Sequence, residues 1–173
     1  MQGKVKATSF AELYGAHARD VYRFALYLSG DTALAQDITS ETFLRVWLAE
    51  QPVRPTSVKG WLFVIARNLY RHELRHLRRK MPLDPTMPSA DSVAGTFEAK
   101  EKLARVLKAL AALPEVDRCA LLMRVVEGFP YGEIAATLHI SVAAAKVKVH
   151  RARLGLSESL GGIDNEHIER RHP

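Results

Sequence analysis

Two stretches of this chain are rich in basic side chains and poor in acids, a composition suited to binding a polyanion. The stretch 59–80 carries seven lysines and arginines against Glu73 alone, a local charge of +6. The stretch 141–153 has a local charge of +4 and no acid, and residues 84–101 between the two sum to −3. Either stretch alone could be a solvated helix face. Two of them in one small chain indicate two contact sites on a nucleic acid.

The residues His72-Glu73-Leu74-Arg75-His76 match the H-E-x-x-H signature of zinc proteases. On a helix the two imidazoles would share a face, and the Glu73 carboxylate could act as a base. The neighbouring arginines would repel a dication, and the proline-rich segment that follows is a poor place for a third ligand. We therefore predict no metal site, no catalytic residue and no cofactor.

Asp37 and Glu41 stand one turn apart on a predicted helix, where they can offer two carboxylates to basic groups of a partner. Plain solvation of two surface acids is the alternative. The residues by themselves leave both readings open.

The overall composition is that of a soluble globular protein, with 173 residues, 47% hydrophobic and 25% charged, and a net charge of +6. These values exclude disorder throughout, and no apolar run approaches the roughly 18 residues that suggest a membrane-spanning helix. The polar start lacks a signal-peptide core, so we expect a cytoplasmic protein without direct membrane insertion. Cys119 is the only cysteine, which fits a reducing compartment, and its apolar neighbours predict a small core residue.

The elements that must position these side chains are predicted to be helices throughout. Apolar residues recur at spacings of three and four, Ser9 and Glu12 suggest a cap for the first helix, and Gly30 with Asp31 suggests its end. A proline-rich segment without periodicity interrupts the pattern. The predicted helices span roughly 10–28, 32–50, 57–80, 103–110, 114–128, 131–138 and 142–156. We predict an all-α fold of two small helical domains joined by a flexible linker, with boundaries at 1–80, 81–97 (the linker), 98–160 and 161–173 (a polar tail).

The segment 133–142 is typical of a helix-turn-helix. His139 occupies the turn position that usually holds glycine, a left-handed conformation that histidine tolerates at modest cost. Ser141 would cap the second helix, which carries the basic residues that suit a major groove. An ordinary helical hairpin is the alternative.

Taken together, five groups of residues resemble the extracytoplasmic-function sigma factors of the sigma-70 family, in the family's order and spacing over residues 10–156. They are Asp37 to Trp47, Trp61 to Asn68, Leu113-Pro114, Tyr131 to Ala135, and Lys146 to Arg153. The resemblance implies a non-enzymatic sigma factor with three partners: bacterial core RNA polymerase, promoter DNA and an anti-sigma factor. A stand-alone helix-turn-helix regulator is the alternative, although it would have no need of the first two groups.

The resemblance also implies a role for each domain. Residues 1–80 would be sigma region 2, which binds core polymerase and opens the minus-10 element, and residues 98–160 would be region 4, which reads the minus-35 element. The polymerase-binding residues would be Asp37, Glu41, Leu44 and Trp47. The minus-10 residues would be Trp61, Arg67, Asn68, Arg71, His72 and Arg75. The minus-35 residues would be Ser141, Ala143, Ala144, Lys146, Lys148, Arg151 and Arg153.

Within these sets the individual chemistry differs. Asn68 has an amide that can pair with an unstacked base, and Trp61 is either a stacking platform or a core residue. Lys148 and Arg151 are expected mainly to contact phosphates, and Lys146 is the better candidate for reading a base.

The chain departs from the family pattern at three places. His72 stands where the family often has an acid, Pro130 where it often has a capping serine, and Ala143-Ala144-Ala145 where Gly-Thr-Val is common. Alanines leave only small apolar contacts, so the minus-35 sequence is not predictable from these residues.

Overall fold

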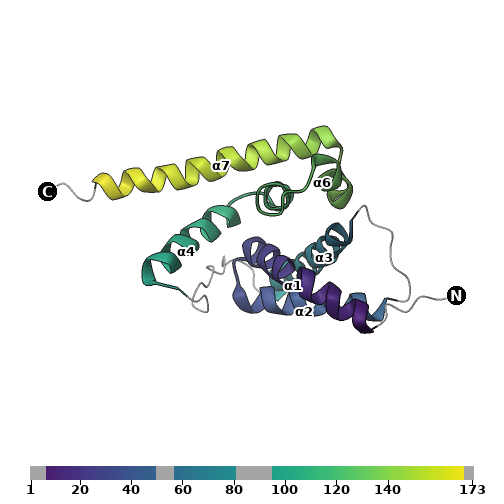
Figure 1. Cartoon of the computed structure of the whole chain (residues 1–173). Helices are drawn as coiled ribbons and strands as arrows, with labels where there is room; N and C mark the ends of the chain where they lie inside the picture. The colour runs from purple at the N-terminus through teal and green to yellow at the C-terminus, as the bar shows by residue number, and fades with distance from the viewer. Residues whose placement is uncertain (1–6, 50–56, 81–94, 170–173) are drawn as a thin grey trace. The chain divides into compact units, whose positions relative to one another are not determined.

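The computed structural model describes residues 7–49, 57–80 and 95–169, and every regular element in these ranges is a helix (Figure 1). The chain divides into two compact units, residues 1–86 and 87–173. The predicted all-α fold with two small domains is confirmed. Most of the predicted linker, 81–94, lies outside the described residues.

The first unit consists of α1 (Ala7–Ser29), α2 (Thr32–Leu48) and α3 (Val58–Lys80). A tight turn joins the first two helices, because Gly30 takes a φ of 72° and the Asp31 carboxylate accepts a hydrogen bond from the Leu34 amide at 2.9 Å. The predicted end of α1 and cap of α2 are therefore confirmed. The capping box predicted at Ser9 is wrong, because α1 already begins at Ala7.

The sequence offers Thr56 or Ser57 as the cap of α3, and the structure describes Ser57. Its hydroxyl accepts a hydrogen bond from the Gly60 amide at 2.9 Å, which satisfies one of the free donors at the start of the helix. Thr56 lies outside the described residues.

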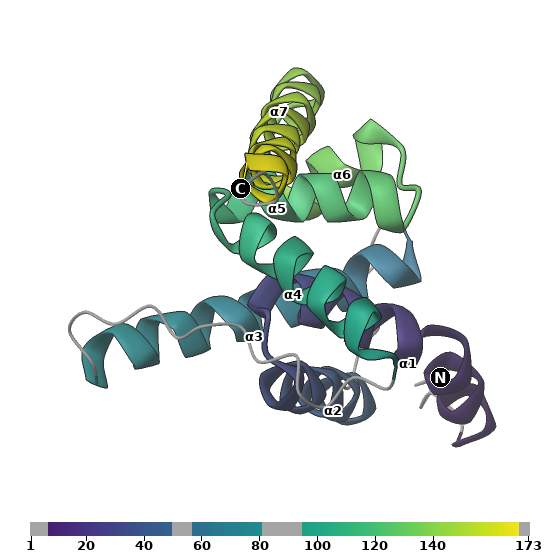
Figure 2. The same cartoon turned by 90° about the vertical axis from the view of Figure 1, so that its left-hand side faces the viewer.

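The three helices pack against one another around an apolar core. At its centre the rings of Phe24 and Phe63 stack with centroids 4.3 Å apart and an interplanar angle of 17°. Other buried side chains surround this pair: Val21, Ala25, Leu28, Ala35, Ile38, Phe43, Val46, Leu62, Ala66, Leu69 and Tyr70. The C-terminal part of α3 projects beyond α1 and α2 (Figure 2). Its exposed side chains include Arg71, His72, Arg75, His76, Leu77 and Arg79.

We expect Phe63→Ala to destabilise the first unit by about 3–5 kcal/mol, because it empties a fully buried ring site and removes the stack on Phe24. Urea unfolding followed by circular dichroism measures the loss. Phe63→Leu, which keeps most of the buried volume, should cost clearly less. Equal losses for the two variants would contradict this account of the core.

The second unit contains α4 (Phe97–Ala111), α5 (Glu115–Leu121), the π-helical turn η1 (Leu122–Val126), α6 (Tyr131–Leu138) and α7 (Val142–Glu169). The long helix α7 packs on α4, α5 and α6. Its contacts close a core in which Cys119 is fully buried, as predicted. Other members of this core are Leu107, Leu110, Leu122, Met123, Ile134, Leu138, Ala145, Val149 and Ala152.

The helix α7 is longer than the periodicity predicts. It continues past Leu156 and through residues assigned to a polar tail, as far as Glu169. Glycines at 155, 161 and 162 do not stop it, because a glycine inside a helix costs only about 1 kcal/mol relative to alanine.

Candidate functional site

The outer side of α2 combines carboxylates with exposed apolar side chains. We call Asp37, Glu41, Leu44, Trp47 and Leu48 the α2 surface; Leu44 is 49% exposed, Trp47 52% and Leu48 66%. The opposite side of the helix supplies the buried residues of the core, so these side chains are free to meet a partner. Exposed apolar side chains gathered in this way mark interaction sites.

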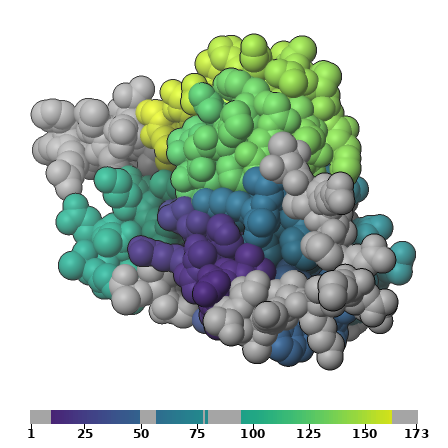
Figure 3. Space-filling model, turned by 45° about the vertical axis from the view of Figure 1, so that its right-hand side comes forward, coloured from purple at the N-terminus to yellow at the C-terminus, as the bar shows by residue number. Residues whose placement is uncertain are grey.

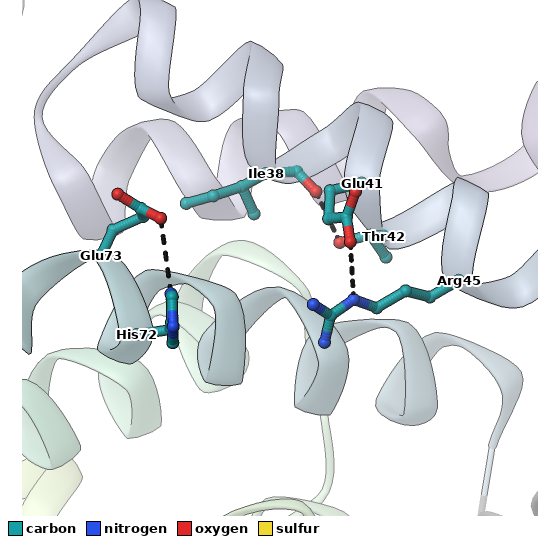
Figure 4. Close-up of polar contacts among 6 residues, drawn as sticks. All are labelled: Ile38, Glu41, Thr42, Arg45, His72 and Glu73. Atoms are coloured by element: carbon teal, nitrogen blue, oxygen red, sulfur yellow. Dashed lines mark hydrogen bonds and ion pairs between the residues drawn. The ribbon is translucent and has the colours of Figure 1, made fainter. Parts of the chain in front are cut away.

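The two carboxylates of the α2 surface differ. Glu41 accepts a hydrogen bond from Arg45 Nε at 2.9 Å, an exposed pair one turn apart (Figure 4). Such a pair contributes only about 0–1 kcal/mol, so a stronger basic partner could displace Arg45. Asp37 is exposed. On the buried side of the same helix, the Thr42 hydroxyl donates a hydrogen bond to the Ile38 carbonyl at 2.7 Å (Figure 4).

Aromatic rings from α1 support one end of the α2 surface. The rings of Phe10 and Trp47 meet edge to face at 4.9 Å, and those of Tyr14 and Phe43 at 4.8 Å. The start of α1, dark purple in Figure 3, lies at the surface of its unit, and Tyr14 is 48% exposed. Sequence reasoning missed Tyr14 and Leu48, although Leu48 continues the spacing of Glu41 and Leu44.

The projecting part of α3 presents most of the predicted minus-10 residues. Asn68, Arg71, His72 and Arg75 are exposed, and Arg75 Nε donates to the Arg71 carbonyl at 3.3 Å. We call these four residues the α3 face. Arginine and amide groups on one solvent-facing side can hold a phosphate backbone and meet unstacked bases.

Two predicted members do not join the α3 face. Arg67 is only 8% exposed, and it lies on the stretch of α3 that also holds the buried Ala66, Leu69 and Tyr70. Trp61 is half-buried, so its burial favours neither the stacking platform nor the core residue. The structure therefore separates Arg67 from the exposed Arg71 and Arg75, with which it shares a helical spacing.

The H-E-x-x-H motif lies on the exposed side of α3. His72 Nδ1 is 3.5 Å from the carboxylate of its neighbour Glu73, and the His72 side chain is 69% exposed (Figure 4). His76 is also exposed. Within the described ranges no three His, Cys, Asp or Glu side chains gather closely enough to hold a metal ion.

The helix-turn-helix forms as predicted between α6 and α7. His139 adopts φ 55° and ψ 47°, and the following Ile140 amide donates to the Ala135 carbonyl at 3.0 Å. The Ser141 hydroxyl then accepts from the Ala144 amide at 3.0 Å and caps α7. Pro130 at the start of α6 makes no side-chain cap bond, in keeping with its departure from the family pattern.

Most basic residues of α7 are exposed, but Lys148 is paired with an acid. Lys146, Arg151 and Arg153 are exposed, together with Ser141 and Ala143, whereas Ala144 is half-buried. Lys148 Nζ lies 3.1 Å from the Asp117 carboxylate of α5, whose side chain is only 6% exposed. Lys148 therefore has an acidic partner within its own unit, and the expectation that it mainly contacts phosphates stays a prediction.

A basic and aromatic cluster beside α7 was not predicted. The Arg124 guanidinium lies 4.8 Å from the centre of the Tyr131 ring, and Lys146 Nζ lies 5.9 Å from it. Arg124 also donates to the Phe129 carbonyl at 2.9 Å. These residues belong to three different elements, so helical spacing gave no signal of their proximity.

The fold and these surfaces define a two-domain helical protein with a basic helix-turn-helix. The chain matches the family models Sigma-70 region 2 over residues 13–80 and Sigma-70, region 4 over residues 103–156. The ECF RNA polymerase sigma factor SigE of Mycolicibacterium smegmatis is 34% identical, with 91% of this chain and 64% of that protein covered. SigL of Mycobacterium tuberculosis is 33% identical, with 88% and 92% covered. The chain belongs to the extracytoplasmic-function sigma factors of the sigma-70 family, which are transcription initiation factors.

Solved structures share this fold. The sigma factor RpoE, in complex with the anti-sigma factor NepR from Bartonella quintana, has a TM-score of 0.74 at 24% identity, with 90% of this chain and 98% of that chain covered. CnrH, in complex with the cytosolic domain of CnrY, has a TM-score of 0.70 at 25% identity, with 90% and 89% covered. No helix in the described parts of the chain is both long and apolar enough to cross a membrane.

Proposed function

We propose that this chain directs bacterial core RNA polymerase to specific promoters and helps to open them. The observation that carries the proposal is the division of surfaces between the two units. The first unit offers an apolar and acidic α2 surface with a basic α3 face, and the second offers a capped basic helix-turn-helix. A regulator that binds only duplex DNA would need the helix-turn-helix alone.

In this proposal the α2 surface docks on core polymerase, with its carboxylates opposite basic groups and Leu44 and Trp47 in apolar contact. The α3 face holds the minus-10 region after the strands separate, with the base-pairing chemistry at Asn68. The helix α7 reads the minus-35 duplex. The chain carries no catalytic residue, because polymerase performs the chemistry, and it works in the cytoplasm beside the chromosome.

We further propose that an anti-sigma factor regulates this chain. The sigma factor RpoE, whose structure has a similar fold, was solved with the anti-sigma factor NepR bound. The exposed apolar residues of the α2 surface offer a place for a protein that competes with polymerase.

Run-off transcription with bacterial core polymerase on genomic DNA tests the main proposal. We expect chain-dependent transcripts whose start sites share minus-10 and minus-35 elements. Duplex binding without polymerase binding, and no chain-dependent transcript, would instead identify a stand-alone regulator.

We expect Asn68→Ala to reduce open complexes while leaving polymerase binding and minus-35 binding near normal. Extruding a base costs a few kcal/mol, and an amide that pairs with that base returns part of this cost. Permanganate footprinting of unpaired thymines measures the bubble, and a pre-melted template should rescue part of the loss. Arg71→Ala is the comparison, because losing a phosphate contact should weaken binding to all sequences and flatten the slope of log affinity against log salt. A melted region of normal extent in the Asn68→Ala variant would show that Asn68 does not pair with a base.

A further inference from the structure

Lys148 differs from the other basic residues of α7 in having a buried partner. Its ammonium is 3.1 Å from the carboxylate of Asp117, which lies 31 residues earlier on α5. The Asp117 side chain is 6% exposed and that of Lys148 is 25% exposed. A charge buried to this extent needs its counter-charge, and removing one partner leaves the other uncompensated. Lys148 is therefore bound to its own unit.

A second close contact ties α7 to the corner between α4 and α5. A Cβ atom built on Gly155 would lie 2.9 Å from Leu113 Cδ2, so the backbone of α7 lies close to this side chain. Gly155 follows Lys148 by two helical turns, about 10 Å along the same side of α7. Arg118 braces the corner by donating to the Ala111 carbonyl at 3.4 Å and the Leu113 carbonyl at 3.2 Å.

Two contacts on one side of a helix set its rotation about its own axis. The exposed Lys146 and Arg151 project from the outer side of α7, away from the buried Ala145, Val149 and Ala152. A rotation of about 30° would move groups at the surface of a helix by about 3 Å. That shift is enough to break a hydrogen bond to a base edge.

We propose that Asp117 and Lys148 are positioning residues that set the rotation of α7, and that Lys148 makes no phosphate contact. This inference rests on the proposed function, because it concerns how the same helix reads the minus-35 duplex. On this proposal Asp117 contributes to sequence discrimination by holding α7 in place, although DNA would repel its negative charge.

The test measures how holoenzyme, assembled from the full chain and bacterial core polymerase, discriminates between two promoter duplexes. One duplex carries the minus-35 sequence that wild-type holoenzyme selects from a randomised pool, and the other carries a scrambled sequence of the same composition. We expect Asp117→Asn to lower the affinity ratio between them by roughly tenfold, the discrimination of about one base contact. Glu158→Gln, which removes an exposed acid from α7, is the matched control and should leave the ratio unchanged.

Lys148→Met separates a positioning role from a phosphate contact. We expect it to lower the same ratio while leaving the slope of log affinity against log salt at the wild-type value. Loss of a phosphate contact would instead flatten that slope by about 0.9. The double variant should be no worse than the single variants, because the two residues act through one another. Lys148→Arg should keep most of the ratio and, since it keeps the ion pair, should fold even if Lys148→Met does not.

An unchanged or raised ratio with Asp117→Asn would overturn the inference, and so would a slope flattened by about 0.9 with Lys148→Met. Effects that multiply in the double variant would also count against it. If wild-type holoenzyme selects no minus-35 sequence, the proposed function itself fails and the inference falls with it.

Discussion

Replacing Leu44 and Leu48 together by serine is expected to weaken the binding of core RNA polymerase by about 30-fold or more. Both side chains are largely exposed, at 49% and 66%, so the fold has little need of them. At a protein interface, apolar anchors that become fully desolvated contribute about 2 kcal/mol or more, which corresponds to roughly this factor. Polymerase binding by fluorescence anisotropy of the labelled full chain measures the change.

The matched control is Leu77→Ser on α3, a similarly exposed leucine (45%) outside the α2 surface. It should leave polymerase affinity unchanged. Trp47→Ala is a less informative variant, because its ring also packs on Phe10 and its loss would disturb α1. Wild-type affinity in the leucine double variant, with the fold intact by circular dichroism, would remove the α2 surface from the polymerase interface.

The acidic half of the same surface can be tested by reversing both charges. Asp37→Lys combined with Glu41→Lys should weaken polymerase binding further, since like charges across an interface cost several kcal/mol. Glu41→Lys also places a lysine beside Arg45, so Asp37→Lys alone is the cleaner measure of a partner's charge.

Removing Lys146 and Arg151 is expected to lower the affinity of holoenzyme for its selected minus-35 duplex by about 30-fold or more. Both side chains are exposed on α7, and a base reader alone accounts for about 1–3 kcal/mol. As a single change, Arg151→Ala should weaken binding to all DNA sequences alike and flatten the slope of log affinity against log salt by about 0.9. Lys146→Ala should instead relax the base preference at one position of the minus-35 element.

The matched control for this pair is Lys102→Ala with Lys108→Ala, which removes two exposed charges from α4 in the same unit. It should change the affinity for the duplex only slightly. An equal loss in the control would mean that total charge, rather than the outer side of α7, governs binding. A duplex bound normally after loss of Lys146 and Arg151 would mean that α7 is not the reading helix.

The sequence by itself determined the features that depend on neighbouring residues. Helical periodicity predicted the elements, and the chemistry of single positions predicted the Gly30 turn, the Asp31 and Ser141 caps and the left-handed His139. These features are local, because a cap or a turn is decided by hydrogen bonds within three or four residues. Periodicity and the proline-rich break in it also predicted two helical domains, which the fold and the family models support.

Only the tertiary structure decided which basic side chains are free to meet DNA. Arg67 shares the helical spacing of Arg71 but is buried, and Lys148 lies among exposed cations but is held by Asp117. Charge counted along the chain gives Arg67, Arg71 and Lys148 the same value. Their availability depends instead on burial and on partners from other helices, 31 residues away in the case of Lys148, and these follow from packing that no local pattern records.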